Sequence, residues 1–255
     1  MCNCRRHPLT TGIDTIDYAL SYKHLEPENA QEHYTEKLIL LDALPVIISK
    51  PKIPDYIKSR KELNLPEDKR LYACPVLGYR IHPDMDKIFA EIMKIEKDSE
   101  IILFDSPHEN NWKSLLIERF KISIGEELTQ RIRFIPYANK EDFSSLLLNF
   151  DVIIDPLHFS TGSTLYTIFS FGIPVVTFAG EFLRGRSATG LYKHMGISGA
   201  ISYSKKEYVD LAIRLGNDKD FYNKLSSEIK ENNSILFDNT QIVDDIKNFL
   251  ISISN

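Results

Sequence analysis

The sequence predicts an α/β protein with a doubly wound parallel sheet, and two observations lead to this fold class. From about residue 98 onward, short apolar runs rich in Val, Ile and Phe alternate with stretches whose apolar residues recur at helical spacing. A strand, a helix and a second strand in this order form a right-handed crossover, which places the strands parallel in one sheet. The chain has 255 residues, of which 43% are hydrophobic, so it can bury a core of this kind.

Each strand is expected where a short apolar run meets turn or charged residues, at residues 101–104, 133–136, 152–155 and 174–177. Helices are expected between these strands, at residues 112–120, 140–149 and 164–171. Trp112, at the start of the first of them, shares its helical spacing with Leu116 and Phe120 and is therefore expected in the core. Apolar residues also recur at helical intervals in the tail from 205 to 248, which is expected to form amphipathic helices that pack on the sheet.

The first 60 residues are organised differently. Residues 12–20 and 30–41 contain strand and helix patterns, but these are too few for a complete second sheet. The segment KPKIP at residues 50–54 has two prolines and no apolar period, which is typical of a linker. We therefore predict the remnant of an N-terminal domain with a linker in residues 1–54, and a Rossmann-like domain with C-terminal helices in residues 55–255.

An incomplete N-terminal domain leaves apolar side chains without cover. We expect Ile13, Ile16, Tyr18 and Leu20 to be poorly buried for this reason. Exposed apolar patches promote association, so self-association through the incomplete domain is expected as well.

The composition limits which class of partner and which cellular compartment are expected for this protein. Acidic residues exceed basic ones, 36 against 31, and no basic stripe is present, which disfavours a nucleic-acid partner and favours a small molecule or a protein. No apolar run approaches the length of about 18 residues that a membrane span needs. The basic start of the chain is not followed by an apolar segment, so a cytoplasmic protein is expected. Cys2 and Cys4 have no second ligand pair at zinc-site spacing, and no metal is expected there.

A run of small polar residues, Ser160 to Thr164, lies between the strand that ends near Asp155 and the helix that follows. The first N–H groups of a helix lack partners, and at the carboxyl edge of a parallel sheet they favour an anion such as a phosphate. A second interpretation stays open, in which Ser and Thr are ordinary helix caps and Gly162 only eases the turn. The run is neither a GxGxxG nor a Walker sequence.

Four segments resemble the O-linked N-acetylglucosamine transferase and SPINDLY family, in the same order along the chain. The main one is DVIIDPLHFSTGSTLYTIFSFGIPVVTFAGEFLRGRSATGLYKHMGI at residues 151–197, in which a strand ending in Asp-Pro leads to a Thr-containing turn and a Gly-x-Pro-Val-Val-Thr strand. The others are residues 7–41 (HPLTTGIDTIDY…TEKLILL), 74–93 (CPVLGYRIHPDMDKIFAEIM) and 208–218 (YVDLAIRLGND).

The resemblance implies a GT-B fold with two Rossmann-like domains and a UDP-sugar in the cleft. It also implies protein O-glycosylation: an inverting transfer of a sugar, N-acetylglucosamine by resemblance, from UDP to protein Ser or Thr, without a metal or another cofactor. Ser163 and Thr164 match the hydroxyls that hold the diphosphate, and Gly162 belongs to the same turn. Arg80 stands where the family has a Lys that neutralises the diphosphate, and it is the expected catalytic residue.

The resemblance places further residues around the nucleoside. Lys140 matches a Lys near the uridine, and the backbone of Ala138 is placed to contact the uracil edge. Thr167 occupies the position of an acidic residue that holds the ribose, but a Thr cannot accept two ribose hydroxyls as a carboxylate does. Arg80 likewise replaces a compact ammonium by a planar fork, which is not a conservative exchange where one oxygen must be met closely.

Two side chains outside these matches are further candidates. His158, in the loop after Asp155, either contacts the donor or packs within the turn. Arg186 is expected to bind a phosphate or the acceptor, as is Arg184, with an ion pair to Glu181 or surface exposure as the alternative. His82 is expected to position the loop that carries Arg80.

Two other functions stay open. The resemblance begins near His7, so the first strands of the family's N-terminal catalytic domain and its tetratricopeptide repeats have no counterpart here. Together with Arg80 and Thr167, this leaves a non-catalytic remnant that binds a nucleotide or a protein partner as the alternative. An epimerase on the same scaffold would need carboxylates and His in the cleft, which the sequence does not indicate.

Overall fold

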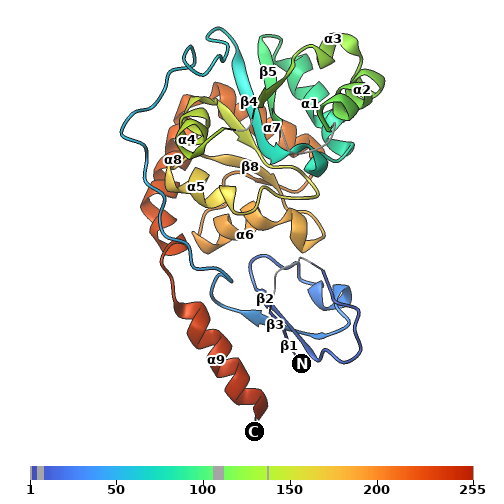
Figure 1. The fold of residues 1–255 in the computed structure, drawn as a ribbon, viewed down its shortest axis with the longest axis vertical. Helices are drawn as coiled ribbons and strands as arrows, with labels where there is room; N and C mark the ends of the chain where they lie inside the picture. Colours follow the sequence, from blue (N-terminus) through green and yellow to red (C-terminus); the bar gives the residue numbers. More distant parts are fainter. Residues whose placement is uncertain (1, 5–8, 106–111, 137, 255) are drawn as a thin grey trace.

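The computed structural model describes residues 2–4, 9–105, 112–136 and 138–254, and within them the chain forms two parallel sheets (Figure 1). The large sheet has six strands in the order β6-β5-β4-β7-β8-β9, and the small sheet has three in the order β1-β2-β3. The bounds in the large sheet are β4 (Arg70–Leu77), β5 (Ser99–Asp105), β6 (Ile132–Pro136), β7 (Val152–Ile154), β8 (Val175–Phe178) and β9 (Ile201–Ser202). The bounds in the small sheet are β1 (Cys2–Cys4), β2 (Tyr18–Tyr22) and β3 (Lys37–Leu41).

Helices on both faces of the large sheet complete the doubly wound arrangement that the alternating pattern predicts (Figure 1). The α-helices are α1 (Asp84–Ile95), α2 (Trp112–Ile124), α3 (Glu126–Thr129), α4 (Lys140–Asn149), α5 (Thr164–Ser170), α6 (Ser187–His194), α7 (Lys205–Asn217), α8 (Lys219–Asn232) and α9 (Gln241–Ser254). Short 3₁₀ helices are η1 (Ala30–His33), η2 (Gly78–Arg80), η3 (Leu183–Gly185) and η4 (Asn233–Leu236).

The strand order places a topological switch between β4 and β7. From β4 the sheet grows outward through β5 to β6, and the chain then returns to the other side of β4 to form β7, β8 and β9. The connections that follow β4 and β7 therefore leave the same edge of the sheet in opposite directions, and a crevice opens between them. Arg80 lies in the first of these connections and Ser160 to Ser163 lie in the second.

β4 is the central strand that the apolar pattern alone does not indicate clearly. Its sequence, RLYACPVL, contains Pro75, which is unusual within a central strand because proline cannot donate to the ladder. The pairing with β5 shifts between Cys74 and Leu77, so an irregularity in the strand accommodates the proline.

One core assignment is wrong. Trp112 is 40% exposed, whereas Leu116 and Phe120 on the same face of α2 are buried. Trp112 is the first residue of α2 and packs against Gly78 of η2, beside the exposed ring of Tyr79.

The last helix packs on the small sheet and not on the large one. Ile242 and Phe249 of α9 form a separate apolar cluster with Leu20, Leu41 and Ala43. Leu20 is therefore only 5% exposed, which corrects the expectation that it lies uncovered, while Ile13 is exposed as expected. α7 does pack on β8 and β9, so the tail divides its helices between the two sheets. Both chain termini consequently lie at the same end of the molecule (Figure 1).

Residues 47–54, which include the predicted linker, have no regular secondary structure. The segment is nevertheless fixed at intervals, because the Asp238 amide donates to the Ile48 carbonyl at 2.9 Å and Ser49 donates to the Asp238 carboxylate at 2.8 Å. The boundary between residues 54 and 55 stays a prediction.

Candidate functional site

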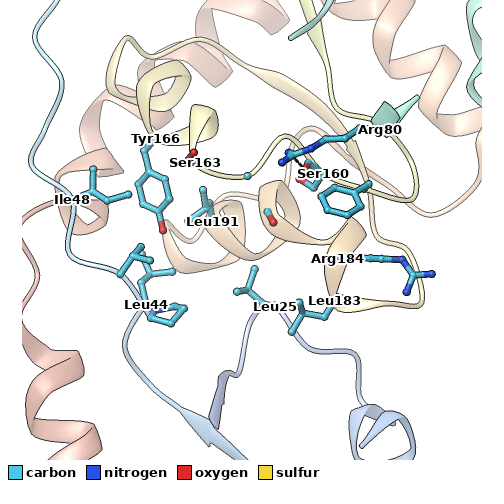
Figure 2. A pocket seen from close by; sticks show the side chains of 15 residues that line it. Leu25, Leu44, Ile48, Arg80, Ser160, Ser163, Tyr166, Leu183, Arg184 and Leu191 are labelled. Atoms are coloured by element: carbon cyan, nitrogen blue, oxygen red, sulfur yellow. Dashed lines mark hydrogen bonds between the residues drawn. The ribbon is translucent and has the colours of Figure 1, made fainter. Parts of the chain in front are cut away.

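Two cavities meet in the crevice at the carboxyl ends of β4 and β7. The larger, of about 490 Å³, lies between the large domain and the chain that joins the two sheets (Figure 2). The smaller, of about 390 Å³, lies between η2, the N-terminus of α4 and the N-terminus of α5. Arg80 and Ser163 line both cavities, so these two side chains mark the passage from one to the other.

The turn after β7 is built around the carboxylate of Asp155, which is fully buried. Its oxygens accept hydrogen bonds from the Thr161 amide, the Thr161 hydroxyl and the Ser160 hydroxyl, each at 2.7 Å. Thr177 of β8 donates a further bond at 3.0 Å. Burial raises the pKa of Asp155, and these hydrogen bonds act in the opposite direction. Asp155 thus holds the turn in place through these hydrogen bonds. Its position in the sequence, after a strand and five residues before Ser160, indicates this role only weakly.

The turn then passes through Gly162 into α5. Gly162 has φ +75°, in the left-handed region that side chains other than glycine rarely adopt, so the turn requires glycine here. Ser163 makes no capping hydrogen bond with its side chain, so the interpretation of this residue as an ordinary helix cap is not supported. Because α5 has only seven residues, Arg80 and not the helix dipole is the main positive charge at the turn.

Arg80 is held against this turn by its own hydrogen bonds. One terminal nitrogen donates to the carbonyls of Ser160 at 3.3 Å and Thr161 at 3.2 Å. The guanidinium lies over the ring of Phe159, 4.7 Å from the ring centroid. Its buried Nε has no hydrogen-bond partner among the described residues. The group is therefore oriented, and it keeps donors for an anion that enters the passage between the cavities.

The N-terminus of α4 forms the opposite wall of the smaller cavity. Ala138 and Lys140 line this wall, and Asn139 caps the helix by accepting from the Asp142 amide at 2.9 Å. Phe104 and Phe143 add two aromatic rings, which lie edge to face at 5.5 Å. The structure thus brings five of the predicted site residues to one cavity: Arg80, Ala138, Lys140, Ser163 and Thr164.

Three other predicted residues line neither of the two cavities. Thr167 is half-buried, one turn further along α5. His158 turns away toward Asp84, whose carboxylate lies 2.8 Å from its Nε2, and it lines a separate cavity of about 280 Å³. Arg186 is buried, and its guanidinium donates to the carbonyls of Leu25 at 2.9 Å and Gly180 at 2.7 Å. His158 and Arg186 therefore make contacts within the protein, and their roles in binding the UDP-sugar stay predictions.

The larger cavity has a wall that comes from the first 48 residues. Leu25 follows β2, and Leu44, Val46 and Ile48 follow β3 (Figure 2). Tyr166, Leu183 and Leu191 line the facing side. Arg184 also lines this cavity, with its guanidinium 4.5 Å from the ring centroid of Phe182. The sequence gives no signal for this wall, because its residues lie far from the turn after β7 along the chain.

The comparisons with known proteins assign the chain to a family. Residues 48–246 match glycosyl transferase family 41. The chain belongs to this family. The six-stranded sheet, the helices on both faces and the crevice at the switch point accordingly belong to a GT-B glycosyltransferase fold, as the resemblance implied. The family segment includes β4 to β9 and both cavity walls that carry Arg80 and Ser163.

Curated relatives in family 41 match most of this chain. A probable UDP-N-acetylglucosamine–peptide N-acetylglucosaminyltransferase, SEC, of Arabidopsis thaliana is 26% identical over 232 residues, which cover 88% of this chain and 23% of the relative. A UDP-glucose:protein N-β-glucosyltransferase of Actinobacillus pleuropneumoniae is 24% identical, over 90% of this chain and 36% of the relative. The chain thus spans about a quarter to a third of the length of these relatives.

Among solved structures, a mutant O-GlcNAc transferase of Thermobaculum terrenum superposes with a TM-score of 0.79 at 22% identity, over 96% of this chain and 46% of that one. The matched region thus leaves only 4% of this chain uncovered. Within the described residues, none of the helices is both long and apolar enough to span a bilayer.

Proposed function

We propose that this chain binds a UDP-sugar and takes part in transferring the sugar to a protein Ser or Thr, without a metal and with inversion at the anomeric carbon. The observation that carries the proposal is the junction of the two cavities at Arg80 and Ser163. The diphosphate occupies this junction, the nucleoside occupies the smaller cavity beside Ala138 and Lys140, and the sugar extends into the larger one.

The chemistry of the junction suits a departing UDP. As the bond to the sugar breaks, negative charge develops on the diphosphate, and fixed donors stabilise that charge where no metal is used. The oriented guanidinium of Arg80 and the hydroxyls of Ser163 and Thr164 supply such donors. Thr167, which lines neither cavity, offers no carboxylate for the ribose, and the loss of one such charged hydrogen bond lowers affinity for the UDP-sugar by about 1.5 to 3 kcal/mol.

N-acetylglucosamine is the proposed sugar because the plant relative carries that donor in its name. The bacterial relative carries UDP-glucose and a protein nitrogen in its name, so members of the family differ in sugar and acceptor atom. UDP is the part of the donor that both names share, and it is the part to test first.

A second candidate function is nucleotide binding without transfer by this chain alone. The described residues that line the two cavities include no carboxylate and no His that could take the proton of an acceptor hydroxyl. The chain covers only 23% and 36% of the two relatives, which are therefore proteins much longer than this chain.

The decisive experiment is a calorimetric titration with UDP of the wild-type chain and of the Ser163→Ala, Thr164→Ala double variant. We expect micromolar binding that weakens at least tenfold in the double variant, a loss of about 1.4 kcal/mol. Ser234→Ala, an exposed serine in η4, serves as the matched control and is expected to bind like wild type. An absence of heat at millimolar UDP would contradict both candidate functions.

A transfer assay then separates the two candidates. With UDP-N-acetylglucosamine and a mixture of acceptor proteins, mass spectrometry detects a modified Ser or Thr if the chain transfers the sugar. Binding of UDP together with no modified residue and no sugar release supports the second candidate.

A further inference from the structure

Two imidazoles and a carboxylate come together just after η2, and none of the three side chains lines either of the two cavities. His82 and Asp84 stand at the start of α1, and His158 comes from the loop after β7. One ligand atom from each lies within 4.8 Å of the others. Nε2 of His158 is 2.8 Å from an Asp84 carboxylate oxygen, and Nδ1 of His82 is 3.9 Å from the same oxygen. The two histidine rings also meet edge to face, with centroids 4.4 Å apart.

The donor set matches the preference of a particular class of ion. Imidazole and carboxylate together suit Zn²⁺ and its neighbours Co²⁺ and Ni²⁺, whereas Mg²⁺ and Ca²⁺ prefer oxygen ligands only. Bonds of about 2.0 to 2.2 Å hold ligand atoms roughly 3 to 3.5 Å apart, so rotations that move the imidazoles by about an ångström complete the site. Because all three side chains are 36% to 50% exposed, an ion can reach them and water can fill the remaining positions.

The protonation of His82 is compatible with this role. Its Nδ1 accepts a long hydrogen bond from the Asp84 amide at 3.2 Å, so this nitrogen is unprotonated, and its lone pair leaves the amide when the ring turns to bind an ion. A metal ligand must be deprotonated in this way.

The main opposing charge is Lys205 at the start of α7. Its ammonium lies 2.9 Å from the same Asp84 oxygen that both histidines approach. An incoming ion must displace this ammonium, whose side chain is half exposed and is able to turn into solvent. We expect the competition to hold the affinity in the micromolar range.

We propose that His82, Asp84 and His158 bind one divalent transition-metal ion of the Zn²⁺ class. The ion joins the turn after β4, two residues beyond Arg80, to the loop after β7, one residue before Phe159. The ion therefore links the two segments that hold the guanidinium of Arg80. None of its three ligands lines either of the two cavities that meet at Arg80 and Ser163. The site is independent of the proposed sugar transfer, which uses no metal.

The test is titration of metal-free protein with Co²⁺, followed by its visible absorption, and with Zn²⁺ in a calorimeter. Because thiolates bind these ions tightly, both are carried out in a Cys2→Ser, Cys4→Ser background. We expect one ion per chain, with at least tenfold weaker binding in His82→Gln and in His158→Gln. His33→Gln is the matched control and is expected to bind like the background. Lys205→Met is expected to bind several-fold more tightly, because the competing ammonium is gone.

Several results would overturn the site. The first is an absence of Co²⁺ binding at 1 mM (roughly a thousandfold above the dissociation constant expected from the competition). The second is Mg²⁺ binding of equal affinity. The third is the same loss of affinity in His33→Gln as in His82→Gln and His158→Gln. Circular dichroism and melting of the metal-free variants establish that they are folded. UDP titration of the same proteins reports separately on the two cavities proposed to bind the UDP-sugar. Failure of the metal site and failure of the proposed function can therefore be distinguished.

Discussion

Arg80 reaches its position through contacts that belong to the loop it faces. Two backbone carbonyls of that loop accept from one terminal nitrogen, and Phe159 supports the guanidinium from the side. A Lys in this place would have one rotatable ammonium and no planar surface to lie on the ring. Arg80, which the resemblance places where the family has a Lys, thus adds to two hydrogen bonds a planar contact with the Phe159 ring.

Removal of the Phe159 ring is expected to loosen Arg80. Phe159→Ala should weaken UDP binding about 2- to 30-fold, because a cation–π contact of this kind contributes about 0.5 to 2 kcal/mol. Phe159→Tyr keeps the ring and should bind like wild type. Calorimetric titration measures both, and wild-type affinity in Phe159→Ala would show that the ring does not orient the guanidinium.

Glu36 links stability to pH. Its buried carboxylate accepts hydrogen bonds from the Thr10 hydroxyl at 2.6 Å, the Thr11 amide at 2.8 Å and the Thr11 hydroxyl at 2.6 Å. Burial opposes ionisation, but the hydrogen bonds outweigh it and lower the pKa of Glu36 from 4.5 to about 2. A carboxylate whose pKa is lowered by folding stabilises the fold at pH values above its pKa in the unfolded chain. That contribution is lost as the pH falls from 4.5 toward 2.

Glu36→Gln is therefore expected to lower the free energy of unfolding by about 1 to 3 kcal/mol at pH 7. The variant should also lose less stability than wild type as the pH falls from 4.5 toward 2, the window between the ordinary and the lowered pKa of Glu36. Urea unfolding at several pH values measures this, with the exposed Glu28→Gln as the control. Parallel pH profiles for Glu36→Gln and wild type would be inconsistent with a lowered pKa.

At the scale of single elements, the pattern of the sequence is most informative where each strand and helix is self-contained. The strands at 101–104, 133–136, 152–155 and 174–177 correspond to β5, β6, β7 and β8, because each is a short apolar run between turns. The pattern does not indicate β4 because Pro75 interrupts it, and the expectation for Trp112 is wrong because helical spacing does not show which turns of a helix the core covers.

The site was predictable to the extent that its residues lie in recognisable segments. Arg80, Lys140 and Ser163 meet at one cavity because strand order brings their turns to one edge of the sheet. The contacts of Arg186 were not predictable, since its carbonyl partner on Leu25 is 161 residues away in the chain. The apolar wall of the larger cavity escaped prediction for the same reason.

The stability of the small sheet is expected to depend most on its contacts with α9. Phe249 packs edge-on against Tyr18, with ring centroids 5.3 Å apart, and the Asp245 carboxylate accepts from the Ala43 amide at 2.9 Å. Phe249→Ala is expected to destabilise the small sheet by about 3 kcal/mol. Hydrogen exchange should then become faster in β2 and β3 and stay unchanged in β5.

The exposed Ile251 on the same helix provides the matched control. Ile251→Ala should leave the exchange of β2 and β3 unchanged. Uniformly faster exchange across both sheets in Phe249→Ala would mean that the two sheets unfold as one unit.

At the scale of the whole molecule, Arg186 and Gly190 hold the small sheet against the large domain. The Arg186 guanidinium bridges the carbonyl of Leu25 and the carbonyl of Gly180. A Cβ on Gly190 would lie 2.4 Å from Leu25 Cδ2, so α6 and the segment after β2 approach as closely as a glycine permits. The apolar wall of the larger cavity therefore depends on this contact.

Arg186→Ala should leave the carbonyls of Leu25 and Gly180 without donors and cost about 2 to 6 kcal/mol of stability, at about 1 to 3 kcal/mol for each unsatisfied group. Urea unfolding measures the loss, and the exposed Arg214→Ala is the control. UDP binding should persist in Arg186→Ala under conditions where it stays folded, since the smaller cavity does not use this residue. Unchanged unfolding would show that water replaces the guanidinium without cost.

The packing of α9 on the small sheet also has a consequence for synthesis on the ribosome. Ala43, at the end of the small sheet, is bonded to Asp245, which is made 202 residues later. At about 5 to 20 residues per second, β2 and β3 wait roughly 10 to 40 s for their covering helix. The family domain between them is able to fold during that interval, before α9 covers the small sheet. Leu20 and Leu41 therefore stay accessible to chaperones until α9 is made, and slowing translation before α9 should lower the soluble yield.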